Sequence, residues 1–192
     1  MKTRIYQDGK SIRIRVASDA TPQETYAAQE LGSYLERMTS TAFDAAEADY
    51  DGPVIAIGKA AERYGVSFDG KDDDFLLRTA GENLCIAGGK RGVIYGVYEI
   101  LERLGCRFFT ATCEKVPFVD ELVLEELDEA HSPDFIYREH NYYEPRVYTK
   151  FAVKSRLNGQ QHPIGEKYGG HIQYSWFVHS FENIVSPEEY GE

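Results

Sequence analysis

The stretch CIAGGKRGVIYGVYEILERLG, residues 85–105, places the glycine-rich run 88–92 between an apolar strand pattern and an apolar helix pattern. Such a corner could hold phosphate, because the free N–H groups and the positive dipole at a helix start attract anions. The spacing excludes both common phosphate loops, since Lys90 is followed by Arg91 rather than by serine or threonine, and the run lacks G-x-G-x-x-G. We therefore predict a structural corner, with Lys90 and Arg91 solvated at the start of the helix.

Histidine and tryptophan are concentrated in the last third of the chain, after residue 130. These residues are His131, His140, His162, His171, His179 and Trp176. Aromatic faces, arginine and histidine bind neutral polar ligands such as sugars, but ordinary interfaces use the same residue types. Composition thus leaves a ligand surface and an interface as alternatives. No metal site or cofactor is expected, because the histidines have neither H-x-x-x-H nor H-E-x-x-H spacing.

Glu139 and Glu144 are the carboxylates that come closest to resembling a catalytic pair. Glycoside hydrolysis usually needs two carboxylates across the scissile bond, one as acid and one as base or nucleophile. An odd separation along a strand points the two side chains to opposite faces, unless Pro145 follows a bend. We therefore predict no catalytic residues within this sequence.

Two helix patterns, one capped and one bounded by glycine, would supply apolar side chains to the core. Thr21, Pro22 and Glu24 give the N-cap, first-turn proline and capping box of a helix that begins near residue 22. A second apolar helix pattern runs from Gly92 to residue 104, where Gly105 is placed to end it. Gly92 and Gly96, one turn apart, would let this helix approach a sheet closely.

Strand patterns occupy the intervals between these helices. Residues 2–7 and 12–16 predict a β-hairpin, 53–58 a buried strand, and 75–79 with 84–87 a second hairpin. Residues 107–109 and 121–127 would add edge strands. The expected fold class is α+β, with two long helices packed on a mixed sheet over residues 1–128.

Composition indicates a globular chain whose partners are not polyanions. Of its 192 residues, 42% are hydrophobic and 28% charged, and the net charge of -11 opposes binding to nucleic acid or an anionic membrane. No run of about 20 apolar residues is present. Residues 1–9 lack the apolar core of a signal peptide, so we expect a cytoplasmic chain, with a secreted chain whose leader was removed as the alternative. Three cysteines without C-x-x-C spacing suggest free thiols.

The last residues carry a helix-start signature. Ser186, Pro187 and Glu189 stand in the order of N-cap, first-turn proline and capping-box glutamate, but 190–192 are all that follows. An isolated helix of this length is unstable. The segment is therefore either a capped turn or the beginning of an element in a larger domain, and we favour the second interpretation.

Three stretches together resemble a known family. AAQELGSYLERMT, VIAIG and DDFLLRTAGENLCIAGGKRGVIYGVYEILERLGCRFF are similar to the N-terminal accessory domain that precedes the catalytic barrel in bacterial alpha-glucuronidases and beta-N-acetylhexosaminidases. The resemblance covers residues from about 22 to 127, and its most specific part runs from 86 to 109. In that family this part is a structural strand–turn–helix, which the resemblance implies here too.

The resemblance continues into residues 129–192. FAVKSRLNG (151–159) and HSFENIVSPEEYGE (179–192) are similar to the start of a barrel domain of uncharacterised function in large, carbohydrate-active bacterial proteins. It implies that 129–192 form the first elements of an incomplete (β/α) barrel. The hexosaminidase signature H-x-G-G-D-E is absent from the sequence, so the catalytic pair that the family implies would lie beyond residue 192.

The segment SPDFIYREHNYYEPR resembles the first barrel strand of the hexosaminidases, in which the arginine matching Arg138 contacts sugar hydroxyls. Glu139 stands where that family has glycine and Tyr143 where it has aspartate, and a buried structural ion pair is the alternative role for Arg138. The candidate substrate-binding residues are Arg138, Glu139, His140, Arg146, Trp176 and His179.

The resemblance implies the non-catalytic N-terminal portion of a glycoside hydrolase that acts in carbohydrate breakdown. Two alternatives remain: a carbohydrate-binding module that acts alone, and a scaffold domain with no ligand of its own. The expected partners are carbohydrate, and either the rest of the chain's own barrel or a second copy of the chain. Neither nucleic acid nor a membrane is expected as a partner.

Overall fold

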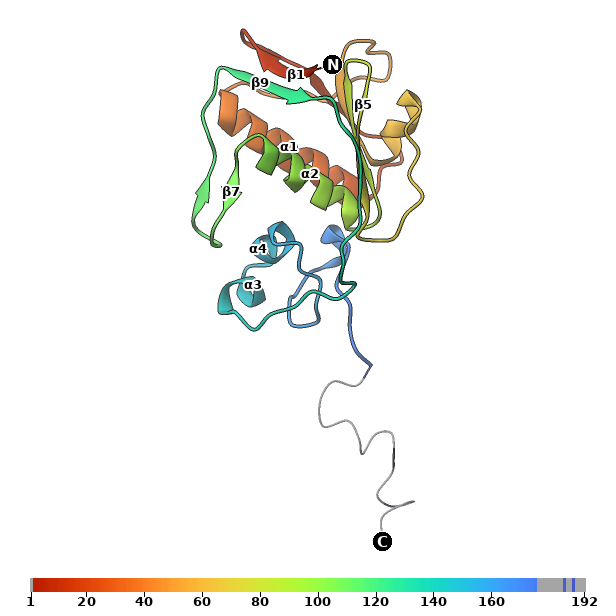
Figure 1. The fold of residues 1–192 in the computed structure, drawn as a ribbon, viewed down its shortest axis with the longest axis vertical. Helices are drawn as coiled ribbons and strands as arrows, with labels where there is room; N and C mark the ends of the chain where they lie inside the picture. The colour runs from red at the N-terminus through yellow and green to blue at the C-terminus, as the bar shows by residue number, and fades with distance from the viewer. Residues whose placement is uncertain (1, 176–184, 186–187, 189–192) are drawn as a thin grey trace.

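The computed structural model describes residues 2–175, 185 and 188, and its main layer is a five-stranded mixed β-sheet (Figure 1). In spatial order its strands are β10 (Asp128–His131), β5 (Phe75–Ala80), β6 (Asn83–Gly88), β4 (Val54–Ile57) and β3 (Arg13–Arg15). Strands β3, β4 and β6 are parallel, whereas β5 and β10 each pair in antiparallel fashion. The expected buried strand and second hairpin are confirmed by β4, β5 and β6.

Two smaller sheets complete the β structure. One has the order β2 (Lys10–Ser11), β1 (Lys2–Gln7) and β9 (Glu121–Glu125), and the other pairs β7 (Arg107–Phe108) with β8 (Glu114–Lys115). The expected hairpin is therefore correct only at its turn, because β3 leaves β1 and pairs in parallel with β4. The expected edge strands β7 and β9 also form, but in the two smaller sheets and not at the edge of the main sheet. The helix over residues 22–39 connects β3 to β4 as a crossover between parallel strands, and strand periodicity does not encode this pairing.

Helices α1 (Pro22–Thr39) and α2 (Gly92–Arg103) lie side by side on one face of the main sheet (Figure 1). The predicted capping box of α1 is confirmed: the Thr21 hydroxyl accepts from the Glu24 N–H, and the Glu24 carboxylate accepts from the Thr21 N–H at 2.7 Å. A 3₁₀ helix, η1 (Gly58–Tyr64), packs against the small residues of a second apolar cluster. The α+β class with two long helices on a mixed sheet is confirmed.

The core between the helices and the sheet is apolar and closely packed. Its fully buried side chains include Leu31, Leu35, Ile55, Ile57, Leu84, Ile86, Ile94 and Leu101. Cys85 and Cys106 are buried and Cys113 is exposed, all as free thiols, as expected. Every helix that the described residues form is too short or too polar to cross a bilayer.

The segment from 132 to 175 packs against α1 and α2 and lies below them in Figure 1. It contains α3 (Tyr143–Val147), α4 (Thr149–Lys154) and the 3₁₀ helix η2 (Glu166–Tyr168). Buried side chains of this segment join the main core; they are Ala152, Val153, Leu157 and Ile164. We refer to residues 132–175 as the C-terminal segment. Strand β10 crosses the boundary expected at residue 128 and ties this segment to the main sheet.

The barrel strand expected over 135–142 does not form, and the described residues of the C-terminal segment contain no β-strand. Side chains take the peptide groups that a neighbouring strand would need. The carbonyl of Ile136 accepts from the Asn158 amide at 2.8 Å, and the Arg138 N–H donates to the Asn158 side chain at 2.8 Å. The backbone here is therefore held as an irregular loop.

Gly96→Ala should lower the free energy of unfolding by about 1–3 kcal/mol through overpacking. An added Cβ would lie 2.8 Å from Ile86 Cγ2 and 3.3 Å from Phe75 Cδ2. The higher helix propensity of alanine, about 1 kcal/mol, acts in the opposite direction. Urea unfolding measures the difference, with Gly165→Ala as the control because a Cβ there has no atom within 4 Å. Equal or higher stability of Gly96→Ala would contradict the close contact of α2 with the sheet.

Candidate functional site

The glycine-rich corner before α2 is filled by protein backbone. The N–H groups of Arg91 and Gly92 both donate to the Asp72 carbonyl at 2.8 Å, and the Gly89 N–H donates to the Asp74 carbonyl at 2.9 Å. A Cβ on Gly89 would lie 2.1 Å from the Lys71 carbonyl oxygen. The loop 71–74 thus occupies the position that a phosphate would take, and the prediction of a structural corner is confirmed.

The prediction that Arg91 is solvated is wrong. Its side chain is 8% exposed, and Nε pairs with the Asp73 carboxylate, whose side chain is 7% exposed. A second nitrogen donates to the Gly169 carbonyl at 3.1 Å. Lys90 is the solvated residue of the pair and forms an ion pair with Glu166 at 2.7 Å. Arg91 turns inward because burying the guanidinium is offset by an equally buried carboxylate.

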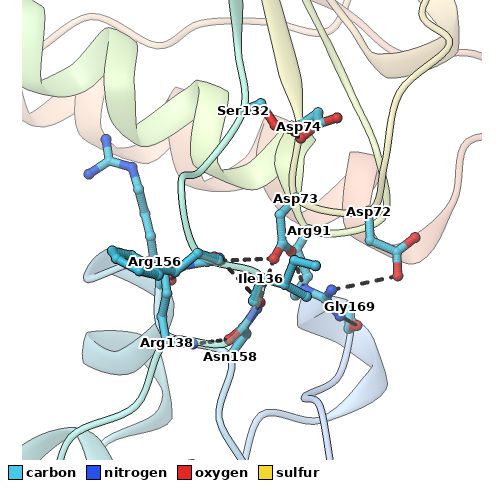
Figure 2. Close-up of polar contacts among 11 residues, drawn as sticks. Asp72, Asp73, Asp74, Arg91, Ser132, Ile136, Arg138, Arg156, Asn158 and Gly169 are labelled. Carbon is cyan, nitrogen blue, oxygen red and sulfur yellow. Dashed lines mark hydrogen bonds and ion pairs between the residues drawn. The ribbon is translucent and has the colours of Figure 1, made fainter.

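Asp73 is the centre of a polar cluster that joins the loop 71–74 to the C-terminal segment (Figure 2). Besides Arg91, its carboxylate accepts from Arg138 at 2.9 Å and from the Asn158 amide at 2.8 Å. Asn158 is fully buried, and both ends of its amide are hydrogen-bonded. We call Asp73, Arg91, Arg138 and Asn158 the Asp73 cluster. The Asp73 carboxylate is bonded to two guanidinium groups and one amide, so the cluster is suited to holding segments together.

Arg138 bonds through every nitrogen of its guanidinium group. Nε donates to the Arg156 carbonyl at 2.7 Å, Nη1 to the Phe135 carbonyl at 2.6 Å, and Nη2 pairs with Asp73. The guanidinium also lies 5.7 Å from the centre of the Tyr95 ring. Burial, with Asp73 next in importance, raises the pKa of Tyr95 to about 12, so this hydroxyl stays neutral. The arrangement is that of a structural ion pair.

A cleft of about 610 Å³ adjoins the Asp73 cluster. It is lined by Lys71, Asp72, Asp73, Asp74, Lys90, Arg91, Ser132, Pro133, Ile136, Gly169, His171 and Ile172. Its polar groups are largely engaged with one another. The Ser132 hydroxyl donates to Asp74 at 2.7 Å, and this bond, together with the Lys71 N–H, lowers the pKa of Asp74. Lys90 forms an ion pair with Glu166, so its charge is also paired within the protein. The cleft is therefore polar but internally paired.

The candidate substrate-binding residues do not converge on one cavity. Next to Arg138, Glu139 accepts from the Tyr137 hydroxyl and from the Gln161 N–H, each at 2.7 Å. His140 contacts the rings of Tyr142 and His162. Arg146 is exposed on α3, in a separate groove. Trp176 and His179 lie outside the described residues.

Glu139 and Glu144 each anchor backbone. Glu144 accepts from the Ala111 N–H at 3.0 Å and so fixes α3 to the loop between β7 and β8. Glu139 holds the N–H of Gln161. Neither arrangement is that of an acid facing a base across an open site. Among the described residues, no three His, Cys, Asp or Glu side chains gather as metal ligands would.

A second polar contact docks the C-terminal segment on α1. Lys154 of α4 pairs with Glu114 of β8 at 3.0 Å, and Glu114 also accepts from Arg37 at 2.6 Å and from the Tyr34 hydroxyl at 2.7 Å. Burial alone would raise the pKa of Glu114, but these three hydrogen bonds outweigh it and lower the pKa to about 2. Glu114 therefore stays ionised and fixes α4 against α1.

Sequence analysis missed Asp73 and Asn158. For Asp73 a signal was available, because the second hairpin pairs Phe75 with Gly88. Residues just before Phe75 must then face residues just after Gly88, which places the aspartates of the loop 71–74 beside Arg91. Asn158 had no such signal, since nothing near it in the sequence indicates that its partner lies 85 residues away.

No protein-family model matches this chain, and no curated protein matches it either. Among solved structures, it is similar to a family GH115 4-O-methyl-alpha-glucuronidase with specificity for decorated arabinogalactans, with 15% identity and a TM-score of 0.63. The match covers 88% of this chain and 29% of that one, so the chain spans less than a third of that structure. The fold is therefore one that forms part of a glycoside hydrolase.

Two further similar structures are more distant. One is a GH138 enzyme targeting pectin rhamnogalacturonan II, with 16% identity and a TM-score of 0.42 over 66% of this chain and 16% of that one. The other is CpGH84B, with 19% identity and a TM-score of 0.49 over 82% of this chain and 26% of that one.

Asp73→Ala should lower the free energy of unfolding by about 3–5 kcal/mol, because it leaves Arg91 and Arg138 without their buried carboxylate. Limited proteolysis should then cut the C-terminal segment faster than the rest of the chain. The matched control is Asp72→Ala, which removes a 62% exposed carboxylate 3.6 Å from Arg91 and should change stability by less than about 1 kcal/mol. Equal losses in the two variants would contradict the central role of Asp73.

Acid should remove the stabilisation that Glu114 provides. Its folded-state pKa of about 2 lies below the ordinary value of 4.5, so the stabilisation is present above about pH 4.5 and is lost as pH falls towards 2. Glu114→Gln should therefore melt at a lower temperature than the unchanged protein near pH 6. The gap should close on acidification in thermal melts across this range. A gap of constant size would show that the ion pairs of Glu114 do not stabilise the fold.

Proposed function

We propose that this chain is the non-catalytic N-terminal portion of a glycoside hydrolase-like protein that acts in carbohydrate breakdown. The observation that carries the proposal is the similarity to the GH115 alpha-glucuronidase, with a TM-score of 0.63 over 88% of this chain but only 29% of that enzyme. A match of this extent suits a domain that accompanies a larger catalytic unit.

The geometry of the polar groups supports an accessory role. Asp73 is neutralised by two arginines, and Glu139 and Glu144 hold backbone N–H groups, so each of these carboxylates has a structural task. Arg138, the candidate sugar contact, bonds to protein groups through each nitrogen. On this proposal the catalytic residues belong to the larger protein, and the C-terminal segment leads towards them.

Exposed apolar side chains on the C-terminal segment favour a further contact. They are Phe135, Ile136, Tyr142, Tyr143, Val147, Tyr148 and Tyr174, each at least 46% exposed. Patches of this kind mark interaction sites. The rest of a catalytic barrel, a second copy of the chain, or carbohydrate stacked on the tyrosines would each cover them. The tyrosines are the observation that favours a carbohydrate-binding module as the second candidate function.

The purified chain should release no product from 4-nitrophenyl glucuronides or N-acetylhexosaminides, whereas a longer protein that carries the catalytic unit should. A chromogenic assay with both substrates measures this. The matched control is the Glu139→Gln, Glu144→Gln double variant, which lacks both carboxylates but keeps the fold's other contacts. Turnover that persists in this variant comes from contaminating host enzymes. Turnover by the unchanged chain that disappears in the double variant would place the chemistry in this chain and overturn the proposal.

A further inference from the structure

Asn158 and Gly159 form the one Asn-Gly pair of the sequence. In such a pair the backbone nitrogen of glycine can attack the side-chain amide carbon of asparagine, because glycine has no Cβ to shield that nitrogen. The new N–C bond closes a succinimide ring, the Cγ–Nδ2 bond breaks, and ammonia leaves with the proton of the glycine nitrogen. Water then opens the ring to aspartate or isoaspartate, so the reaction needs no reagent besides water.

The fold requires both residues of this pair. The Asn158 amide donates from Nδ2 to the Asp73 carboxylate at 2.8 Å and accepts at Oδ1 from the Arg138 N–H at 2.8 Å (Figure 2). Glycine is needed at 159 because a Cβ there would lie 2.4 Å from Glu139 Cβ. Packing therefore keeps a reactive pair at the contact between the C-terminal segment and the loop 71–74.

The closed Asp73 cluster protects the pair from this reaction. Asn158 has no exposed surface, and Gly159 is buried as well. The attacking nitrogen is engaged, since the Gly159 N–H donates to the Arg138 carbonyl at 3.1 Å. The leaving nitrogen is engaged too, through its bonds to Asp73 and to the Ile136 carbonyl. The amide carbon must turn towards the glycine nitrogen to react, so these bonds must break first.

The product of the reaction does not fit the closed cluster. Oxygen replaces the Nδ2 that faces two acceptors at 2.8 Å, the Asp73 carboxylate and the Ile136 carbonyl, and an ionised carboxylate has no proton to donate to either. Like charges in contact also repel. Isoaspartate adds a methylene to the main chain, which displaces the N–H groups of residues 158 and 159 that share the Arg138 carbonyl.

We infer that Asn158 is a site of spontaneous deamidation that the Asp73 cluster controls. Each transient opening of the cluster exposes the pair, and each reaction makes the opening permanent. The contact between the C-terminal segment and the loop 71–74 therefore has a limited chemical lifetime, which depends on how often the cluster opens. This inference is independent of the proposed function, since it involves neither a ligand nor a catalytic unit.

Peptide mapping by mass spectrometry, on the chain aged in warm and mildly alkaline buffer, tests the reaction. In urea that unfolds the chain, Asn158 should deamidate faster than Asn83 and Asn141, which precede leucine and tyrosine. In the folded chain the rate at Asn158 should be at least about tenfold lower, because only the open fraction reacts. Equal rates at Asn158 in the folded and unfolded chain, or a rate in urea no faster than those of the other two, would overturn the inference.

Control by the cluster is tested with Asp73→Ala, which removes a bond that holds the leaving nitrogen. It should raise the rate at Asn158 in the folded chain at least about tenfold. Asp72→Ala should leave the rate unchanged, since that exposed carboxylate pairs with Arg91 rather than with Asn158. If Asp73→Ala does not fold, urea below the unfolding transition replaces it, and the rate should rise while far-UV circular dichroism stays constant. Equal rates in the two variants, or a rate that rises only as the helices melt, would contradict control by the cluster.

The consequence is tested on the deamidated chain, which anion exchange separates by its added negative charge, and on Asn158→Asp. Limited proteolysis should cut the C-terminal segment of both at least about tenfold faster than that of the unchanged chain. Asn141→Asp is the matched control, because it adds the same charge at an exposed position of the same segment. Unchanged protection in the deamidated chain and in Asn158→Asp, or equal loss in Asn141→Asp, would show that the reaction does not release the segment and would overturn the inference.

Discussion

One buried carboxylate, that of Asp73, holds the two parts of this molecule together. It receives a guanidinium from the helix start at Arg91 and another from the C-terminal segment at Arg138, and Asn158 completes its bonds. Arg91 is buried and Arg138 is half-buried, because the carboxylate offsets the charge of each. The path of the chain from 132 to 159 follows from this arrangement, since Arg138 and Asn158 must both reach the same acceptor.

The cluster in turn requires the glycines of the corner before α2. A side chain on Gly89 or Gly92 would meet the backbone of the loop 71–74 at about 2 Å, so glycine is what allows that loop to lie against the helix start. With the loop in place, its carbonyls take the free N–H groups of the helix, and Asp73 points inward. The same residues that suggest a phosphate loop in the sequence therefore serve to bring a carboxylate to Arg91.

Local signals in the sequence predict local structure well, as the capping box at Thr21 and the hairpin of β5 and β6 show. Pairings between distant strands are not predicted, because the alternation in β3 is the same whether it pairs with β1 or with β4. The role of Arg138 was open for the same reason: its partner Asp73 is 65 residues earlier, and a buried ion pair and a sugar contact need the same side chain. Arg146 was a candidate by resemblance, but its exposed position in a groove separate from Arg138 required the structure.

The separation of the groups in the Asp73 cluster also has a consequence for the order of folding. Asp73 and Asn158 are 85 residues apart, so closing this contact costs more chain entropy than forming either helix or the hairpin of β5 and β6. Contacts between residues this far apart in the sequence form late in folding, after the surface on which the segment packs has formed. The C-terminal segment should thus acquire its structure after the two helices and the hairpin of β5 and β6, and lose it before them.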